Sequence, residues 1–360
     1  MTLIATSICL LLLGGGILVQ GIEEVDYNNP ILPEVFQSVI GQGFAVKYFT
    51  QITKKPIEKY NESNIQDVYD AGFRNVRLRC TASFYPYPYN STNFTTLFLD
   101  NLEKVVDKCL EVGVAPIISW ANVPAQNYAT QEDEDNFVTW WTKVAERLKQ
   151  KDFRLAFNLM TEIGNAFCGK QDDCDINGTI KENITKYYSW TSRAKEAIRN
   201  TTKNNKRRIL ILSSPKKSAW GLDLIPKELY KRDRYLMVEH HHYASGPNKK
   251  PDSGKYWTGN GTEEQRKMLV EELTFASNFA LKNYFGAWAP LDIKKGTLLQ
   301  HEVESFAKFF VSTLRNFSVP WSLNALDMYY DTKSATWLTE YQEEKGLNMA
   351  PVLDVIKQYM

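Results

Sequence analysis

Short apolar and β-branched runs alternate with helix-period segments along almost the whole chain. Eight such runs fall at residues 43–49, 75–80, 114–120, 154–160, 207–214, 235–243, 283–289 and 319–326. The segments between them carry an apolar stripe and a charged face, most clearly at residues 94–113, 136–150, 266–283 and 298–316. Strand, helix and strand repeated with short links predict a parallel sheet with right-handed crossovers.

Chain length and glycine placement indicate how that sheet is arranged. A chain of 360 residues suits one α/β barrel. A doubly wound open sheet is the alternative, and it would carry a G-x-G-x-x-G turn after the first strand. Here Gly41 and Gly43 of GQGFAV precede the strand. We therefore predict an α/β protein, a single-domain (β/α)8 TIM barrel over residues 22–360.

The first 21 residues have the pattern of a secretory signal peptide. An apolar run at residues 3–19 is followed by Gly21 and then by charged residues. Because no Lys or Arg precedes this run, an uncleaved anchor is the alternative. Eight N-x-S/T sequons agree with secretion, and they lie at Asn61, Asn90, Asn93, Asn177, Asn183, Asn200, Asn260 and Asn316. We expect a secreted, extracellular glycoprotein with no membrane attachment after signal cleavage.

Charge and cysteine content narrow the class of partner. Forty-three basic and 42 acidic residues leave a net charge of +1 without a basic tract, so we expect no nucleic-acid partner. Cys168 and Cys174 are spaced to close a short disulfide loop, and Cys80 and Cys109 would then pair or stay free. The sequence lacks paired cysteine ligands at zinc-finger spacing, and we predict no metal and no cofactor.

Residues 240–242 are three consecutive histidines on a predicted strand. Because neighbouring side chains on a strand point to opposite faces, only His241 should face the barrel interior, together with Glu239. The outer two histidines should face the helices, which argues against one shared metal ion. An inward carboxylate at Glu239 needs a cationic partner, and Arg77 or Arg79 is in a position to supply it.

Four motifs lie in order on the second, fourth, sixth and eighth predicted strands: GFRNVRLR, RLAFNLMTEI, MVEHHHYASGP and VPWSLNAL. Taken in this order, they resemble the strand motifs of glycoside hydrolase family 5, the cellulase-type retaining glycosidases. The resemblance runs over most of residues 41–338. It implies that Arg77 is a sugar-binding arginine, that Glu162 at the end of the fourth strand is the acid/base, and that His241 and Tyr243 form the His-x-Tyr pair of the sixth strand. Chemistry in such barrels gathers at the carboxyl ends of the strands.

The chain departs from that family at the position of the second carboxylate. In the family, the attacking glutamate ends strand seven, whereas YFGAWAP here places Ala287 at that position. Glu302 and Glu304 are the next acids, but their segment has helical apolar spacing. Thr161 stands where the family has an asparagine before the acid/base. The resemblance therefore implies a barrel that has kept Glu162 and lost its nucleophile.

Tryptophans near strand ends are candidates for stacking on sugar rings. Trp120 and Trp288 lie near the carboxyl ends of strands three and seven, and Trp321 or Asn324 takes the place of the family's eighth-strand tryptophan. Packing between barrel and helices is the alternative role. The predicted substrate-binding set is Arg77, Trp120, Thr161, His241, Tyr243, Trp288 and Trp321.

Two functions follow from the resemblance. The first is a secreted barrel that no longer hydrolyses glycosides and acts as a glycan-binding or structural extracellular protein. The second is an active glycosidase that cleaves β-linked polysaccharide of the cellulose, glucan or mannan type, with Glu162 as acid/base. They are separated by whether an acid besides Glu162 reaches the barrel mouth near Ala287. The sequence favours the first.

Overall fold

The structure is a computed structural model, and it describes most of the chain. The described residues are 7–13, 16–22, 25–50, 57, 59–82, 91–92, 94–121, 125, 128–161, 180–215, 217–244, 257–290, 298–339 and 346–360. Side chains are described within these ranges from residue 25 onward, except at residues 180–183.

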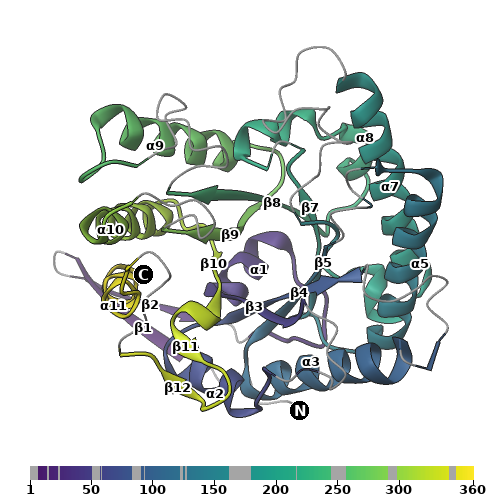
Figure 1. Cartoon of the computed structure of the whole chain (residues 1–360), viewed down its shortest axis with the longest axis horizontal. Helices are drawn as coiled ribbons and strands as arrows, with labels where there is room; N and C mark the ends of the chain where they lie inside the picture. The colour runs from purple at the N-terminus through teal and green to yellow at the C-terminus, as the bar shows by residue number, and fades with distance from the viewer. Residues whose placement is uncertain are drawn as a thin grey trace.

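Eight parallel strands close into a barrel in the order β10-β3-β4-β5-β6-β7-β8-β9 (Figure 1). Their bounds are β3 Gln42–Phe49, β4 Asn75–Thr81, β5 Ala115–Ala121, β6 Ala156–Asn158, β7 Leu210–Ser213, β8 Leu236–Tyr243, β9 Asn283–Ala289 and β10 Trp321–Asn324. Each lies within or overlaps one of the eight runs predicted from the sequence. The predicted (β/α)8 barrel is therefore confirmed, and the open-sheet alternative is excluded.

Helices surround the barrel on its outside (Figure 1). The longer ones are α2 Ser63–Asp70, α3 Asp100–Val112, α5 Gln131–Leu148, α7 Ile180–Asn200, α9 Glu263–Ser277, α10 Gln300–Asn316 and α11 Ala350–Tyr359. Shorter turns are the π-helical η2 Phe94–Leu99, the 3-10 helices η3 Lys203–Lys206, η4 Ala219–Leu224 and η6 Leu326–Met328, and α8 Lys227–Tyr230. The four clearest helix predictions are confirmed, and Glu302 and Glu304 lie on α10 as expected.

Local sequence signals account for several element boundaries. Thr130 and Asp133 form a capping box at the start of α5, and Thr262 and Gln265 form another at the start of α9. Helix α3 ends at Val112 and is capped by Gly113, whose φ of 96° is a left-handed conformation that favours glycine. Such caps satisfy the backbone groups that the ends of a helix leave unpaired.

The strands are buried on both faces, as parallel strands in a barrel require. All seven residues of β5 and all seven of β9 are buried. Their outward side chains join the large apolar core under the helices, and their inward side chains fill the barrel.

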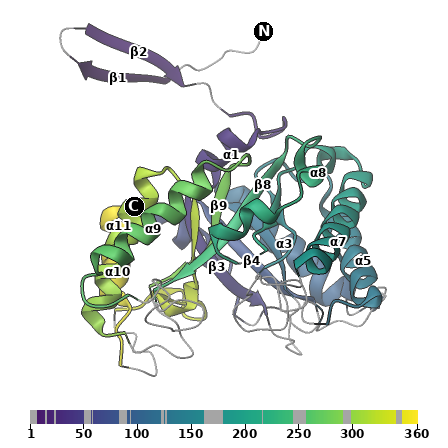
Figure 2. The same cartoon turned by 90° about the horizontal axis from the view of Figure 1, so that it is seen from above.

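A separate apolar cluster fills the amino-terminal half of the barrel interior. It contains Ile117 of β5, Ile211 of β7 and Met237 of β8. Phe36 and Ile40, from the helix that precedes β3 in the sequence, close the cluster at its outer end. That helix, α1 Pro33–Ile40, covers the amino-terminal end of the barrel (Figure 2). With this end closed, the opposite end is where a ligand has access, as in other barrels of this type.

Two small sheets lie outside the barrel. Strands β1 Ser7–Leu13 and β2 Gly16–Ile22 pair antiparallel, as do β11 Tyr330–Asp331 and β12 Thr336–Trp337. The signal peptide over residues 1–21 stays a prediction. Within the described part of the chain, no helix has the length and apolar character needed to cross a membrane.

Candidate active site

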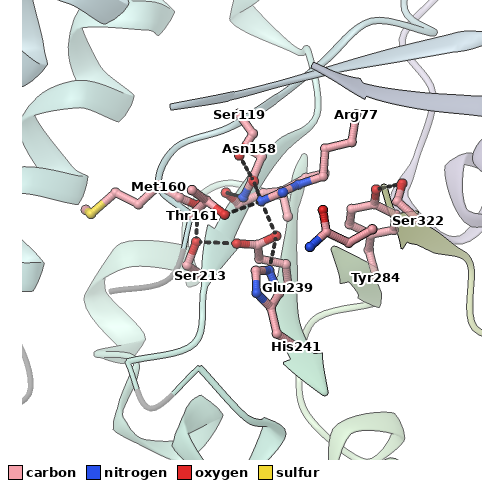
Figure 3. Close-up of polar contacts among 12 residues, drawn as sticks. Arg77, Ser119, Asn158, Met160, Thr161, Ser213, Glu239, His241, Tyr284 and Ser322 are labelled. Atoms are coloured by element: carbon pink, nitrogen blue, oxygen red, sulfur yellow. Dashed lines mark hydrogen bonds and ion pairs between the residues drawn. The ribbon is translucent and has the colours of Figure 1, made fainter. Parts of the chain in front are cut away.

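Inward side chains change from apolar to polar at the same level on four neighbouring strands. Two residues further along each strand, Ile117 is followed by Ser119, Ala156 by Asn158, Ile211 by Ser213 and Met237 by Glu239. The register pairs Ser119 with Asn158, and Ser213 with Glu239. It pairs Asn158 with Ile211, so the two polar pairs are joined by Arg77 of β4, which contacts both Asn158 and Glu239. Toward the carboxyl ends of the strands, the barrel therefore holds a group of buried polar side chains, called the polar layer below. Figure 3 draws its hydrogen bonds and ion pairs.

Arg77 reaches this layer from β4 and holds it together. Its Nη2 donates to Asn158 Oδ1 at 2.9 Å and to Thr161 Oγ1 at 2.5 Å, and it lies 3.3 Å from Glu239 Oε2 (Figure 3). Ser119 Oγ also donates to Asn158 Oδ1, at 2.5 Å. The guanidinium thus connects strands β4, β6 and β8, and the predicted ion pair between Arg77 and Glu239 is confirmed.

Both oxygens of the Glu239 carboxylate have polar partners. Oε1 accepts from Ser213 Oγ at 2.8 Å, and Oε2 lies 3.4 Å from His241 Nε2 as well as near Arg77. Burial raises the pKa of Glu239, but the charges of Arg77 and His241 and the hydrogen bonds outweigh it and lower the pKa to about 2. Glu239 is therefore ionised at neutral pH, although only 1% of it is exposed.

Strand β9 bulges where the family motif places its second glutamate. His240 pairs with Phe285 and His241 pairs with Ala287, so Gly286 is an extra residue between them. A classic bulge places two successive residues on one side of a sheet. Glu239 Oε2 would lie 1.8 Å from a Cβ on Gly286. The carboxylate of Glu239 therefore lies directly against Gly286, the residue before Ala287.

Further polar residues follow at the mouth. Asn324 Nδ2 donates to Tyr243 Oη at 3.1 Å, joining the ends of β10 and β8. His241 is 7% exposed, and Tyr243 and Asn324 are half-buried. The structure thus brings Arg77, Thr161 and His241 together and places Tyr243 one inward position beyond His241.

The predicted tryptophan platform needs correction. Trp120 packs on Phe137 of α5, Trp288 packs on Phe310 of α10, and Trp321 packs edge-on against Trp288. All three indoles are at most 1% exposed. Strand alternation explains this arrangement, because each tryptophan neighbours an inward residue and so faces the helices. Asn324, not Trp321, is the inward residue at the end of β10.

The two outer histidines of the triplet face the helices, as predicted. His242 Nδ1 lies 3.1 Å from Glu272 Oε2 of α9, and the His240 ring packs on Phe285. Among the described residues, no group of three His, Cys, Asp or Glu side chains is arranged to hold a metal ion.

Several predicted residues lie outside the described part of the chain. These are Glu162, Cys168, Cys174, Asn90, Asn93 and Asn177, and the side chain of Asn183 is not described either. The sequon asparagines whose side chains are described, Asn61, Asn200, Asn260 and Asn316, are all exposed. Cys80 and Cys109 are free, buried thiols, and burial raises the pKa of both.

Sequence reasoning missed Ser119, Asn158, Ser213 and Gly286 as members of the site. The change from apolar to polar inward residues was visible once strand alternation was applied to each run. The bulge at Gly286 was not visible, because it depends on the register between β8 and β9.

The fold and the polar layer define a (β/α)8 barrel with its site at the carboxyl ends of the strands. Residues 39–288 match the model of the cellulase family, glycosyl hydrolase family 5. Because the match covers more than half of the chain, the chain belongs to glycosyl hydrolase family 5.

Individual relatives agree with this assignment. Endoglucanase H of Acetivibrio thermocellus is 27% identical over 263 residues, which cover 69% of this chain and 25% of that protein. The chain thus spans a quarter of that relative's length.

Solved structures share the fold. A mutant of the family 5 lichenase of Caldicellulosiruptor sp. F32 in complex with cellotetraose has a TM-score of 0.70 at 18% identity, covering 94% of this chain and 97% of its own. A mutant of PbGH5A, a family 5 enzyme of Prevotella bryantii B14 in complex with a xyloglucan tetradecasaccharide, has a TM-score of 0.70 at 14% identity, covering 92% and 99%.

Proposed function

We propose that this barrel binds β-linked glucan at its carboxyl-terminal mouth and does not hydrolyse it. Family membership and the relatives' names support the substrate class, since an endoglucanase and a lichenase are among them. The observation that carries the loss of hydrolysis is Ala287, which stands beside His241 where the family motif has a glutamate.

Retaining hydrolysis requires two carboxylates at the scissile bond. One protonates the leaving oxygen and the other attacks the anomeric carbon, and the two carboxyl groups lie about 5–5.5 Å apart. A methyl group at position 287 offers no lone pair for that attack. Removal of an attacking group costs several kcal/mol of transition-state stabilisation, and about 1.4 kcal/mol is already tenfold in rate.

Glu239 is a poor substitute for the missing carboxylate. Its Oε1 accepts a hydrogen bond from Ser213, its Oε2 faces Arg77 and His241, and only 1% of the residue is exposed. A carboxylate whose lone pairs are stabilised by donors is a weak nucleophile. We therefore assign Glu239 to ion pairing with Arg77.

The arrangement at the mouth suits binding without chemistry. Half-buried Tyr243 and Asn324, which are hydrogen-bonded to each other, and His241 supply hydroxyl, amide and imidazole groups at the carboxyl-terminal end of the barrel. Sugar-hydroxyl recognition uses such groups, fixed in place by a rigid scaffold. Exposed sequons at the outer surface support a secreted glycoprotein as the form in which the barrel acts.

An active glycosidase is the second candidate. The observation that favours it is the ionised carboxylate of Glu239 beside Gly286, next to the expected nucleophile position. In that case Glu162 would act as acid/base, and Glu239 would have to leave Ser213 and Arg77 to attack the sugar.

The test is paired measurement of binding and turnover. Calorimetry with cellohexaose, laminarihexaose and mannohexaose should show binding to a glucan, and reducing-sugar assays on the polymers should show no product. His241→Ala should weaken binding about tenfold, whereas His301→Ala, at an exposed position on α10, should not. Product release that Glu162→Ala abolishes would establish the second candidate instead. If no glucan or mannan binds, the proposed function is wrong.

A further inference from the structure

We propose that the buried site accommodates only one carboxylate, so that Glu239 and a glutamate at position 287 are mutually exclusive. Glu239 is the positioning residue that occupies the place beside Arg77. The anionic partner of Arg77 is Glu239 on β8. A glutamate at position 287 on β9 would be a second candidate for the same role. This inference rests on the proposed loss of the nucleophile at Ala287. It implies that Ala287→Glu alone does not restore an ionised carboxylate at that position.

The space around the bulge accommodates one carboxylate. Because of the bulge, Gly286 and Ala287 both approach the interior, and Ala287 is paired with His241. The Glu239 carboxylate fills the volume over Gly286, with Oε2 at 1.8 Å and Cδ at 2.9 Å from the position of an added Cβ. Ala287 follows Gly286 in the same bulge, so a longer inward side chain at 287 would compete for the space that the Glu239 carboxylate occupies.

The charges around Glu239 also suit one carboxylate. Glu239 is flanked by the cationic Arg77 and by His241, and Tyr284 and Tyr187 also face it as neutral phenols. Lys217 lies near the same position at the end of β7. Arg77 Nη2 is already shared among Asn158, Thr161 and Glu239. In the described part of the layer, a second carboxylate would therefore share its cations with the first.

Two carboxylates in one buried site cannot both ionise without a large penalty. Since Glu239 keeps its charge to low pH, a glutamate at 287 would be the one forced to hold a proton. Its folded-state pKa would then lie above its unfolded value, so the substitution would destabilise the protein at neutral pH and less so in acid.

The experiment compares Ala287→Glu with its neutral isostere Ala287→Gln, each alone and combined with Glu239→Gln. Thermal unfolding is followed from pH 7.5 to pH 4.5 on the full chain without any sugar. The pair Ala287→Glu and Ala287→Gln shares the steric cost, so their difference isolates the charge. This comparison stands even if Glu239→Gln fails to fold.

At pH 7.5, Ala287→Glu should melt roughly 5 °C below Ala287→Gln, and the gap should close by pH 4.5. In the Glu239→Gln background the order should reverse, with Ala287→Glu above Ala287→Gln, because the new carboxylate becomes the partner of Arg77. Equal melting of the Glu and Gln variants at every pH, in both backgrounds, would overturn the proposal.

The outcomes distinguish this inference from the proposed function. If the wild type hydrolyses glucan, the proposed function fails, but the melting comparison still tests whether the two carboxylates exclude each other. If the wild type is inert and the two positions show no coupling, only the inference fails.

Discussion

Arg77 Nη2 lies 3.3 Å from Glu239 Oε2 at the centre of the barrel, with side chains that are 2% and 1% exposed. The pair joins β4 to β8 at the level where the interior changes from apolar to polar. Breaking a buried pair leaves one uncompensated charge, which costs more than the pair itself contributes. The stability of the site therefore depends on both residues, whatever the barrel binds.

Glu239→Gln should destabilise the protein in a pH-dependent way. The folded-state pKa of Glu239 is about 2, below its ordinary 4.5, because Arg77, His241 and Ser213 outweigh the effect of burial. A lowered carboxylate pKa contributes stability that is present above pH 4.5 and is lost as the pH falls toward 2. The contribution is on the order of 3 kcal/mol at pH 7. Urea unfolding of both proteins should show a gap that narrows between pH 4.5 and pH 2.

The matched control for this prediction is Glu271→Gln on α9. Glu271 lies 3.8 Å from Lys267, and both side chains are more than half exposed. Exposed pairs contribute little to stability. A Glu271→Gln effect as large as that of Glu239→Gln would show that burial of the pair is not the cause.

His240→Phe should stabilise the protein in acid. His240 is buried against Phe285, and burial lowers its pKa to about 4 from the usual 6.5. A lowered histidine pKa means that stability is full above pH 6.5 and is lost as the pH falls toward 4, because the unfolded chain takes up the proton. Phenylalanine removes this proton uptake. Melting curves should favour the variant increasingly from pH 6.5 to pH 4, and a constant offset across that range would contradict the assignment.

Gly286→Ala should be strongly destabilising. The added methyl group would lie 1.8 Å from Glu239 Oε2, so the carboxylate must leave its position near Arg77. We expect a loss of about 3 kcal/mol or more, comparable to breaking the ion pair. Gly346→Ala is the control, because its Cβ meets nothing within 4 Å and only its φ of 75° opposes the change. Calorimetric unfolding in which both variants lose the same stability would argue against close contact at the bulge.

Trp288→Ala should lower the stability of the barrel and should not remove a sugar-stacking contact. Trp288 is fully buried among Phe306, Phe310 and Trp321. Truncating a buried tryptophan costs about 3–5 kcal/mol. Denaturant midpoints measure this loss, with Tyr128→Ala as control because Tyr128 is 75% exposed. A Trp288→Ala protein with wild-type stability and weakened glucan binding would restore the stacking role.

The fold was predictable from periodicity, because each barrel strand is a short apolar run followed by a helix with one apolar face. Pairing of Glu239 with Arg77, and the inward direction of His241, also followed from alternation along single strands. The same rule, applied to residues 119–121 and 287–289, would have directed Trp120 and Trp288 toward the helices.

Other parts of the site depend on contacts between distant strands. The bulge at Gly286 arises from the register of β9 against β8, and local sequence carries no signal for that register. The contact between Glu239 and Gly286 joins positions 47 residues apart in the sequence. The closed barrel brings Glu239 of β8 next to the bulge of β9, where the family motif has its glutamate.

Covalent trapping of a nucleophile tests the proposed loss of hydrolysis most directly. Retaining glycosidases form a glycosyl-enzyme intermediate, which an activated 2-deoxy-2-fluoro-β-cellobioside makes long-lived enough to weigh. Intact-mass spectrometry of the wild type after incubation with this reagent should show no added fluorocellobiosyl group, because position 287 is alanine. A stoichiometric adduct, mapped by peptide sequencing to Glu239 or to any other carboxylate, would contradict the loss of the nucleophile and identify an active glycosidase.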